Sequence, residues 1–140
     1  MNIQLLTLDK ETVVLNSLLK RDRPNLILFY NTYCLGCTGR AIPFAYELTK
    51  DFHELNLIVI HTNFGNQTFS KAEILDIFKS KNAPFDIFID PQAKAYEHFD
   101  CEGTPHWVVL DKDIQRFRSI FGSQTHAKQR LFYALESLNQ

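Results

Sequence analysis

The alternation of apolar and polar positions divides the chain into short strands and amphipathic helices. Residues 3–8 and 12–15 alternate loosely on either side of a polar break, which predicts an N-terminal hairpin. Four later apolar runs predict strands at 26–30, 55–60, 85–89 and 106–110. A tight turn after the last run and alternation over 115–121 predict its antiparallel partner.

Helical spacing of apolar residues fills most of the gaps between these strands. It predicts helices at 38–50, at 93–99 and after Ser123, and a brief helical turn capped by Asn16 or Ser17. A capping box over 70–73 predicts another helix, which we expect to stop near Ala83–Pro84. This order predicts one α/β domain over residues 1–140, with a mixed sheet and helices on both faces.

Composition narrows the function classes. The chain has 140 residues, 45% of them hydrophobic and 22% charged, which suits one folded domain with a real core. Its net charge of −1 gives no strong field for nucleic acid, and no apolar run is long enough to cross a membrane. The first nine residues carry no basic signal-peptide region. We therefore expect a cytoplasmic protein, or an extracytoplasmic one if a signal has been removed.

Two cysteines, Cys34 and Cys37, stand between the predicted strand 26–30 and the helix that follows. The motif by itself fits redox chemistry or metal binding, but this placement favours redox chemistry because the positive end of a helix favours a thiolate. Cys34 is expected to be the exposed nucleophile and Cys37 the buried resolving thiol. Cys101 is left over and is expected to pack as a small buried hydrophobe.

A second element, Thr104–Pro105, stands directly before the strand predicted at 106–110. Proline has no backbone N–H for a sheet ladder, so it belongs at the first position of a strand or in a special turn.

Residues 26–37, Pro43, the Thr104–Pro105 element and the closing strand–turn–strand–helix together resemble the thioredoxin superfamily. The hairpin and a strand–helix insertion over residues 61–90 are most similar to its TlpA/ResA-like thiol-disulfide oxidoreductases. The resemblance implies a thioredoxin-like fold in which Pro105 is cis and lies against the cysteines, while the backbone of Thr104 meets the partner.

The resemblance also implies a substrate surface that includes Tyr33, Leu35 and Gly36 between and beside the cysteines. The implied partners are protein thiols or disulfides and an upstream redox partner. No cofactor is expected beyond a redox-active disulfide between Cys34 and Cys37, and no metal.

Five features depart from the family pattern. Tyr33 stands where the family commonly has Trp, and Leu35–Gly36 stands in place of a Gly-Pro or other Pro-containing dipeptide. Typical thioredoxins have a buried Asp where this chain has Leu28, and the TlpA-like branch often has Glu where this chain has Arg40. Pro43 comes one residue later than usual, so the helix register is altered. The usual proton acceptor for Cys37 is therefore missing.

Three residues are candidates to modulate the thiols in its place. Arg40 would favour a thiolate if it lies close to the pair. Glu102 and His106 flank the Thr104–Pro105 element, and imidazole titrates near neutral pH.

Three alternatives use the same fold. A Sco-like copper chaperone has two cysteines and a distant His, but three residues separate its cysteines where this chain has two. A peroxiredoxin needs a Thr-x-x-Cys loop, which Asn31 before Cys34 does not supply. A non-catalytic binding module would tolerate the loss of one cysteine, and both are present.

Overall fold

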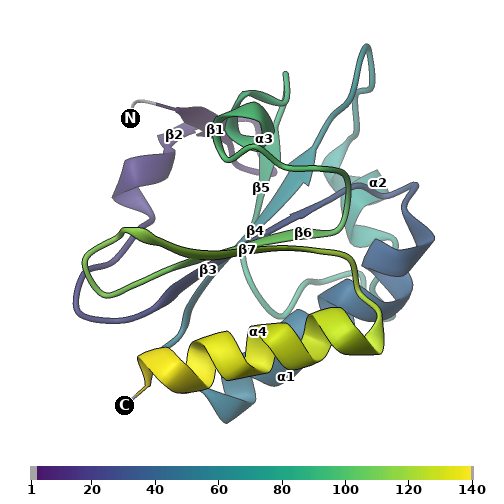
Figure 1. Ribbon diagram of the computed structural model, residues 1–140. Coiled ribbons are helices and arrows are strands. Elements are labelled where there is room, and N and C mark those ends of the chain that lie inside the picture. The colour runs from purple at the N-terminus through teal and green to yellow at the C-terminus, as the bar shows by residue number, and fades with distance from the viewer. Residues whose placement is uncertain (1–2, 140) are drawn as a thin grey trace.

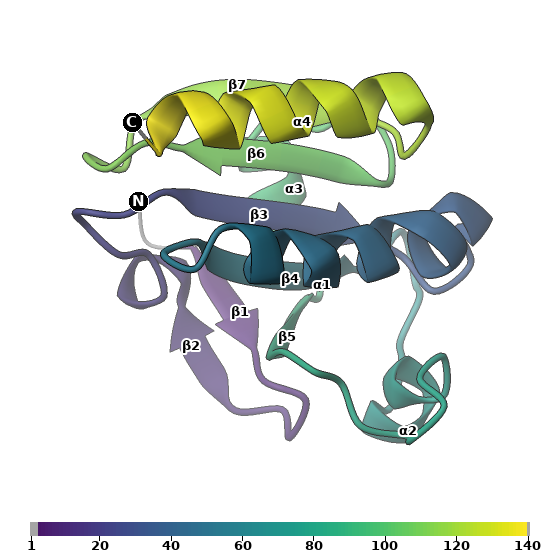
Figure 2. The ribbon, with the colours of Figure 1, turned by 90° about the horizontal axis from the view of Figure 1, so that it is seen from below.

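The computed structural model describes residues 3–139 and shows, over that range, a seven-stranded mixed sheet covered by helices (Figures 1 and 2). The strands are β1 (Gln4–Leu6), β2 (Thr12–Val14), β3 (Asn25–Tyr30), β4 (Asn56–Thr62), β5 (Ile87–Asp90), β6 (His106–Leu110) and β7 (Arg116–Phe121). The helical elements are η1 (Leu15–Ser17), η2 (Cys37–Ala41), α1 (Ile42–Asp51), α2 (Lys71–Leu75), α3 (Lys94–His98) and α4 (Thr125–Leu138). The strand order is β2-β1-β5-β4-β3-β6-β7.

Strand β3 lies inside the sheet because its residues are apolar on both faces. All six of its residues are buried, and it pairs in parallel with β4 and antiparallel with β6. Successive side chains point to opposite faces. Leu28 and Tyr30 therefore join the core on one face, while Ile27 and Phe29 join the core on the other.

Helices cover both faces of the sheet, as the sequence predicts. Figure 2 shows α1 and α4 side by side across one face, with α3 beyond the sheet. Leu48 of α1 and Leu131 of α4 share the core on the first face, which we call the α1/α4 face. Ala95 of α3 and Leu15 of η1 lie in the core of the second face, the α3 face. Within residues 3–139, the helices are all too short or too polar to span a bilayer.

Helix α1 is preceded by a π-helical turn, η2. A π-turn takes one residue more than an α-turn. That extra residue accommodates the late position of Pro43, which lies in the first turn of α1.

Two predicted helix caps are wrong. Helix α4 begins at Thr125 after Gln124, and Ser123 accepts a hydrogen bond from Arg40 instead. The short turn η1 begins at Leu15, and the Ser17 hydroxyl donates back to the carbonyl oxygen of Val14. Short polar side chains bond to whichever backbone or side-chain group the fold brings near, so a cap read from sequence competes with those contacts.

The capping box predicted at Ser70 is confirmed, but the helix that it opens is shorter than predicted. Helix α2 ends at Leu75 instead of near Ala83–Pro84. Beyond it, Phe78 N–H bonds to the Leu75 carbonyl and Lys81 N–H to the Phe78 carbonyl. These i to i−3 bonds make separate turns rather than a continued α-helix.

Candidate active site

The sheet topology brings Cys34 and the Thr104–Pro105 element together. Cys34 follows the end of β3, and Pro105 directly precedes β6. The two strands are antiparallel neighbours, with Phe29 opposite His106. The end of one strand therefore lies beside the start of the other, although the two segments are far apart in the sequence.

The sulfur of Cys34 lies at the centre of the site. Its Sγ accepts a hydrogen bond from the Cys37 N–H at 3.2 Å and lies 3.4 Å from the Thr104 carbonyl oxygen. Both thiols are free; Cys34 is half-buried and Cys37 is fully buried. One accessible sulfur beside one sheltered sulfur is the arrangement that nucleophilic attack followed by internal resolution requires.

Among residues 3–139, no Asp or Glu acts on the pKa of the buried Cys37 thiol. Burial, together with a hydrogen bond between the two cysteine side chains, raises the pKa of Cys37 to about 12. The position where thioredoxins keep an Asp is the fully buried Leu28, on the same face of the sheet as Cys37. The proton of Cys37 is therefore held more tightly than in free cysteine.

The Thr104–Pro105 peptide bond is cis in this structure. The Pro105 carbonyl accepts from the Gly122 N–H at 2.8 Å, which ties the Pro105 loop to the end of β7. Gly103 has a φ of +149°, and a Cβ there would lie 2.7 Å from the ring of Phe121. Only glycine fits this position, so the loop is fixed beside Cys34 by backbone shape as well as by contacts.

Tyr33 and Leu35 lie on the surface on either side of Cys34. Their exposed fractions are 72% and 85%, which makes them the most exposed large apolar side chains among residues 3–139. The Tyr33 ring packs 5.4 Å from the ring of Phe69, centroid to centroid. An exposed aromatic and an exposed aliphatic side chain next to a reactive thiol can contact a partner protein.

Arg40 and Gly36 lie at the same place on the surface. Arg40 is exposed, and its Nε donates to Ser123 Oγ at 3.1 Å. A Cβ at Gly36 would lie 3.1 Å from Arg40 Nη2. The guanidinium therefore lies beside Gly36, in the helical turn between the two cysteines.

The structure places His106 away from the thiols. Neighbouring Trp107 belongs to the core of the α1/α4 face with Cys37, so strand alternation turns His106 toward the α3 face. Its Nδ1 accepts from the Glu102 N–H at 3.3 Å, and its Nε2 lies 2.7 Å from Ser119 Oγ. Burial lowers the pKa of His106. Both ring nitrogens are occupied, which gives the copper-carrier alternative no free imidazole ligand here.

Cys101 packs on the α3 face, against the core opposite to that of Cys37. Burial raises the pKa of its thiol to about 12. Among the described residues, no three His, Cys, Asp or Glu side chains are grouped so that they could hold a metal ion.

The sequence reasoning missed His61, which supports the loop before Cys34. His61 Nε2 accepts from the Thr32 N–H at 3.1 Å, and its Nδ1 lies 2.9 Å from Asn63 Oδ1. Because Nε2 is an acceptor, the ring proton is on Nδ1. Burial lowers the pKa of His61 to about 4, so the ring stays neutral. The only feature that could have pointed to His61 was the parallel pairing of β3 with β4, which places Tyr30 opposite His61.

Tyr30 was also missed. It is fully buried on the face that holds Cys37, and its hydroxyl is the one buried side-chain polar atom in residues 3–139 without a hydrogen-bond partner. Its ring packs edge-on against His61 at 5.0 Å between centroids. Burial, and the charge that Cys37 would carry as a thiolate, both raise the pKa of Tyr30.

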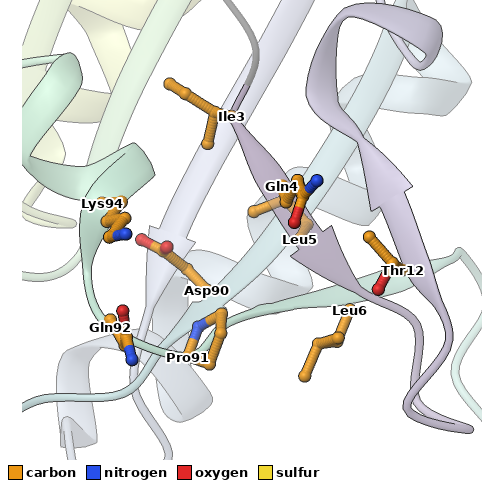
Figure 3. Close-up of a pocket in the computed structure, with 9 residues that line it drawn as sticks. All are labelled: Ile3, Gln4, Leu5, Leu6, Thr12, Asp90, Pro91, Gln92 and Lys94. Carbon is orange, nitrogen blue, oxygen red and sulfur yellow. The ribbon is translucent and has the colours of Figure 1, made fainter.

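A cavity of about 490 Å³ lies elsewhere, between the β1–β2 hairpin and the loop after β5 (Figure 3). Its buried carboxylate, Asp90, accepts hydrogen bonds from the Ala95 and Tyr96 N–H groups at 3.2 and 3.0 Å. Asp90 therefore satisfies backbone N–H groups at the start of α3. None of the predicted site residues lines this cavity.

A sequence profile of the AhpC/TSA family matches residues 1–117. The chain belongs to the AhpC/TSA family. No curated protein matches its sequence.

Solved structures with the same fold cover nearly the whole chain. A secreted disulfide oxidoreductase of Mycobacterium tuberculosis is 14% identical with a TM-score of 0.73, over 98% of this chain and 96% of that one. A thiol-disulfide isomerase of Corynebacterium glutamicum is 20% identical with a TM-score of 0.74, over 98% and 96%. The exposed lipoprotein thioredoxin of Streptococcus pneumoniae is 17% identical with a TM-score of 0.75, over 99% and 100%. The fold of this AhpC/TSA member is thioredoxin-like.

Proposed function

We propose that this protein is a thiol-disulfide oxidoreductase of the TlpA/ResA-like type that acts on protein thiols and disulfides. The observation that carries the proposal is the environment of Cys34 Sγ. Cys34 is half-buried, and its Sγ receives the Cys37 N–H at 3.2 Å and lies 3.4 Å from the Thr104 carbonyl oxygen. The solved structures with this fold include a secreted disulfide oxidoreductase and a thiol-disulfide isomerase, which supports the same reaction class.

In the reducing direction, the Cys34 thiolate attacks one sulfur of a partner disulfide. The other partner sulfur leaves as a thiolate and takes up a proton. Cys37 then gives up its proton and attacks the Cys34 sulfur of the mixed disulfide, which releases the second partner thiol. Two electrons pass to the partner, and the chain keeps a Cys34–Cys37 disulfide that an upstream redox partner must reduce.

Each neighbouring group has a distinct part in this reaction. The Thr104 backbone beside Cys34 would pair with the partner's backbone, with Pro105 fixing the loop. Tyr33 and Leu35 would contact the partner's side chains. The dithiol is itself the redox group, so the proposed reaction needs no further cofactor.

Thiol trapping across a series of redox buffers tests the proposal. The wild-type chain should interconvert between a dithiol and an intramolecular Cys34–Cys37 disulfide. Cys37→Ser should accumulate mixed disulfides with a disulfide-containing protein, and Cys34→Ser should form none through this pair. Cys101→Ser is the matched control and should behave as wild type. Failure of Cys34 and Cys37 to join in any buffer would exclude the proposal.

A further inference from the structure

Two departures from the family pattern, Gly36 and Arg40, meet in one contact. Arg40 Nε donates to Ser123 Oγ at 3.1 Å. A Cβ on Gly36 would lie 3.0 Å from that Oγ and 3.1 Å from Arg40 Nη2. The φ of Gly36 is −66°, which any residue can adopt, so glycine is needed here for space. We call this contact of Gly36, Arg40 and Ser123 the Arg40 clasp.

The Arg40 clasp presents an unpaired cation. No Asp or Glu among residues 3–139 forms an ion pair with Arg40. Nε is used by Ser123, so the four N–H groups of Nη1 and Nη2 remain for a ligand. The exposed guanidinium is also held by the clasp, so less side-chain freedom is lost when it binds.

A second cation lies near the Arg40 clasp. The first turns of η2, α1 and α4 contain no acidic residue. Lys128 Nζ lies 5.2 Å from the ring centroid of Phe44, which is one helical turn beyond Arg40. Figure 2 shows that α1 and α4 begin at the same end of the molecule. Two cations therefore follow the seam between these helices.

The acidic side chain of the Pro105 loop lies on the other side of the site. The Glu102 N–H bonds to His106, which points toward the α3 face. Burial and the charge of the exposed Glu102 both raise the pKa of Tyr96, which packs on that face. Arg40, by contrast, bonds to Ser123 just before α4. The cation beside Gly36 and the carboxylate near Tyr96 therefore lie on different sides of the molecule, so a bound segment meets different charges on its two flanks.

We propose that Arg40 selects partner proteins whose reacting cysteine is flanked by an Asp or Glu side chain. This inference rests on the proposed thiol-disulfide exchange. A carboxylate next to the partner cysteine pairs with the planar fork of the guanidinium, which recognises carboxylates through two parallel N–H···O bonds. Arg40 exchanges no sulfur; it binds the partner and is a specificity residue.

Peptide disulfides that differ at one position test this. In two series, the residue before or after the disulfide-linked cysteine is Glu, Gln or Lys, and kcat/KM is measured for each. In at least one series the wild-type protein should prefer Glu over Gln by about two- to fivefold, mainly through KM, with Lys the poorest. The preference should fall as salt rises, because exposed charges are screened.

Variants locate the effect. Arg40→Gln should bring the Glu and Lys peptides to nearly equal kcat/KM, and Arg40→Lys should keep part of the preference because the charge remains. Arg130→Gln is the matched control: it removes the same charge from an exposed position of α4 that lies beside Tyr133 and outside the clasp. It should keep the full preference.

Equal turnover of the Glu and Lys peptides by wild type in both series would overturn the inference, as would a preference that survives in Arg40→Gln. In either case the proposed function would stand, because the Gln peptide reports exchange without a charged flank. Turnover of none of the peptides would instead count against the proposed function, and the inference would fall with it.

Discussion

At two helix starts in this molecule, a side chain accepts the backbone N–H of the residue three positions later. The two arrangements serve different purposes. At α2, Ser70 Oγ accepts the Glu73 N–H at 3.1 Å. After β3, where helical turns begin directly beyond Cys34, the Cys34 Sγ accepts the Cys37 N–H at 3.2 Å. In both cases the side chain before the first turn satisfies one of the N–H groups that a helix leaves free.

The difference between the two lies in what closes the other half of the cap. At α2, Glu73 reaches back to the Ser70 N–H at 3.0 Å, so the box is complete within four residues. At the dithiol the third residue is Cys37, which is buried and does not reach back as an acid would. Cys34 instead meets Thr104, seventy positions along the chain. The complete cap at Ser70 stabilises the start of α2. The incomplete cap at Cys34 leaves the sulfur free to react.

Alkaline unfolding of the reduced protein should show the largest difference between the two starts. Burial raises the pKa of Cys37 from 9.0 to about 12, so the folded chain keeps a proton that the unfolded chain releases. This stability is complete below about pH 9 and is lost as pH rises toward about 12, with a slope of up to about 1.4 kcal/mol per pH unit. Cys37→Ala should flatten that slope.

The measurement is chemical denaturation at several pH values, followed through the fluorescence of Trp107, the single tryptophan. Cys101, whose pKa is also raised, is present in both proteins and contributes equally to both. Ser70→Ala is the comparison at the other helix start and should leave the alkaline slope unchanged. The same slope in Cys37→Ala and wild type would contradict the burial argument.

His61 should matter next, because it supports the Cys34 loop from a neighbouring strand. His61→Leu leaves the Thr32 N–H and the Asn63 side chain without their partner, at a cost of about 3 kcal/mol in the free energy of unfolding. The exposed His53→Leu is the control and should change it little.

The same variant has a signature in acid. Burial lowers the pKa of His61 from 6.5 to about 4, so between these pH values the unfolded chain binds a proton that the folded chain does not. Its contribution is complete above about pH 6.5 and is lost as pH falls toward about 4. Wild type should therefore lose stability faster than His61→Leu over this range, and parallel curves would show that His61 is not the group responsible. His106, with a pKa lowered in the same direction, contributes to both proteins.

The smallest effect is expected at α2. Ser70→Ala removes the hydroxyl that caps Glu73 and should lower the free energy of unfolding by about 1 kcal/mol. The rate of thiol-disulfide exchange should stay at the wild-type value, because this cap is closed within α2. A slower exchange would mean that the two helix starts are coupled and would remove the distinction between them.

Local pattern was sufficient for some parts of the site and not for others. The apolar run 26–30 predicted the buried strand that ends before Cys34, because burial on both faces requires apolar residues throughout. The same reasoning predicted β6 at its observed bounds, and so placed Pro105 directly before a strand. The cap at Ser70 was predicted because both of its partners lie within four residues.

Ser123 shows why the rest could not be predicted. Serine is a common helix cap, yet the fold brings Arg40 Nε within 3.1 Å of the Ser123 hydroxyl. The two residues are 83 positions apart in the chain. His61 and Tyr30 carried no motif, and only the register of β3 with β4 set them together beneath the site. The end of α2 at Leu75 likewise followed from turns that the helical pattern did not reveal.

The sequence by itself determined the order of the elements, the dithiol at a strand-to-helix junction, and the absence of an Asp at Leu28, because each depends on residues that are neighbours in the chain. The tertiary structure alone decided which groups surround the sulfur atoms. It brought Thr104 to Cys34, turned His106 to the other face, and laid Arg40 across Gly36. Those outcomes depend on strand register and side-chain direction, which arise only when distant segments pack against one another.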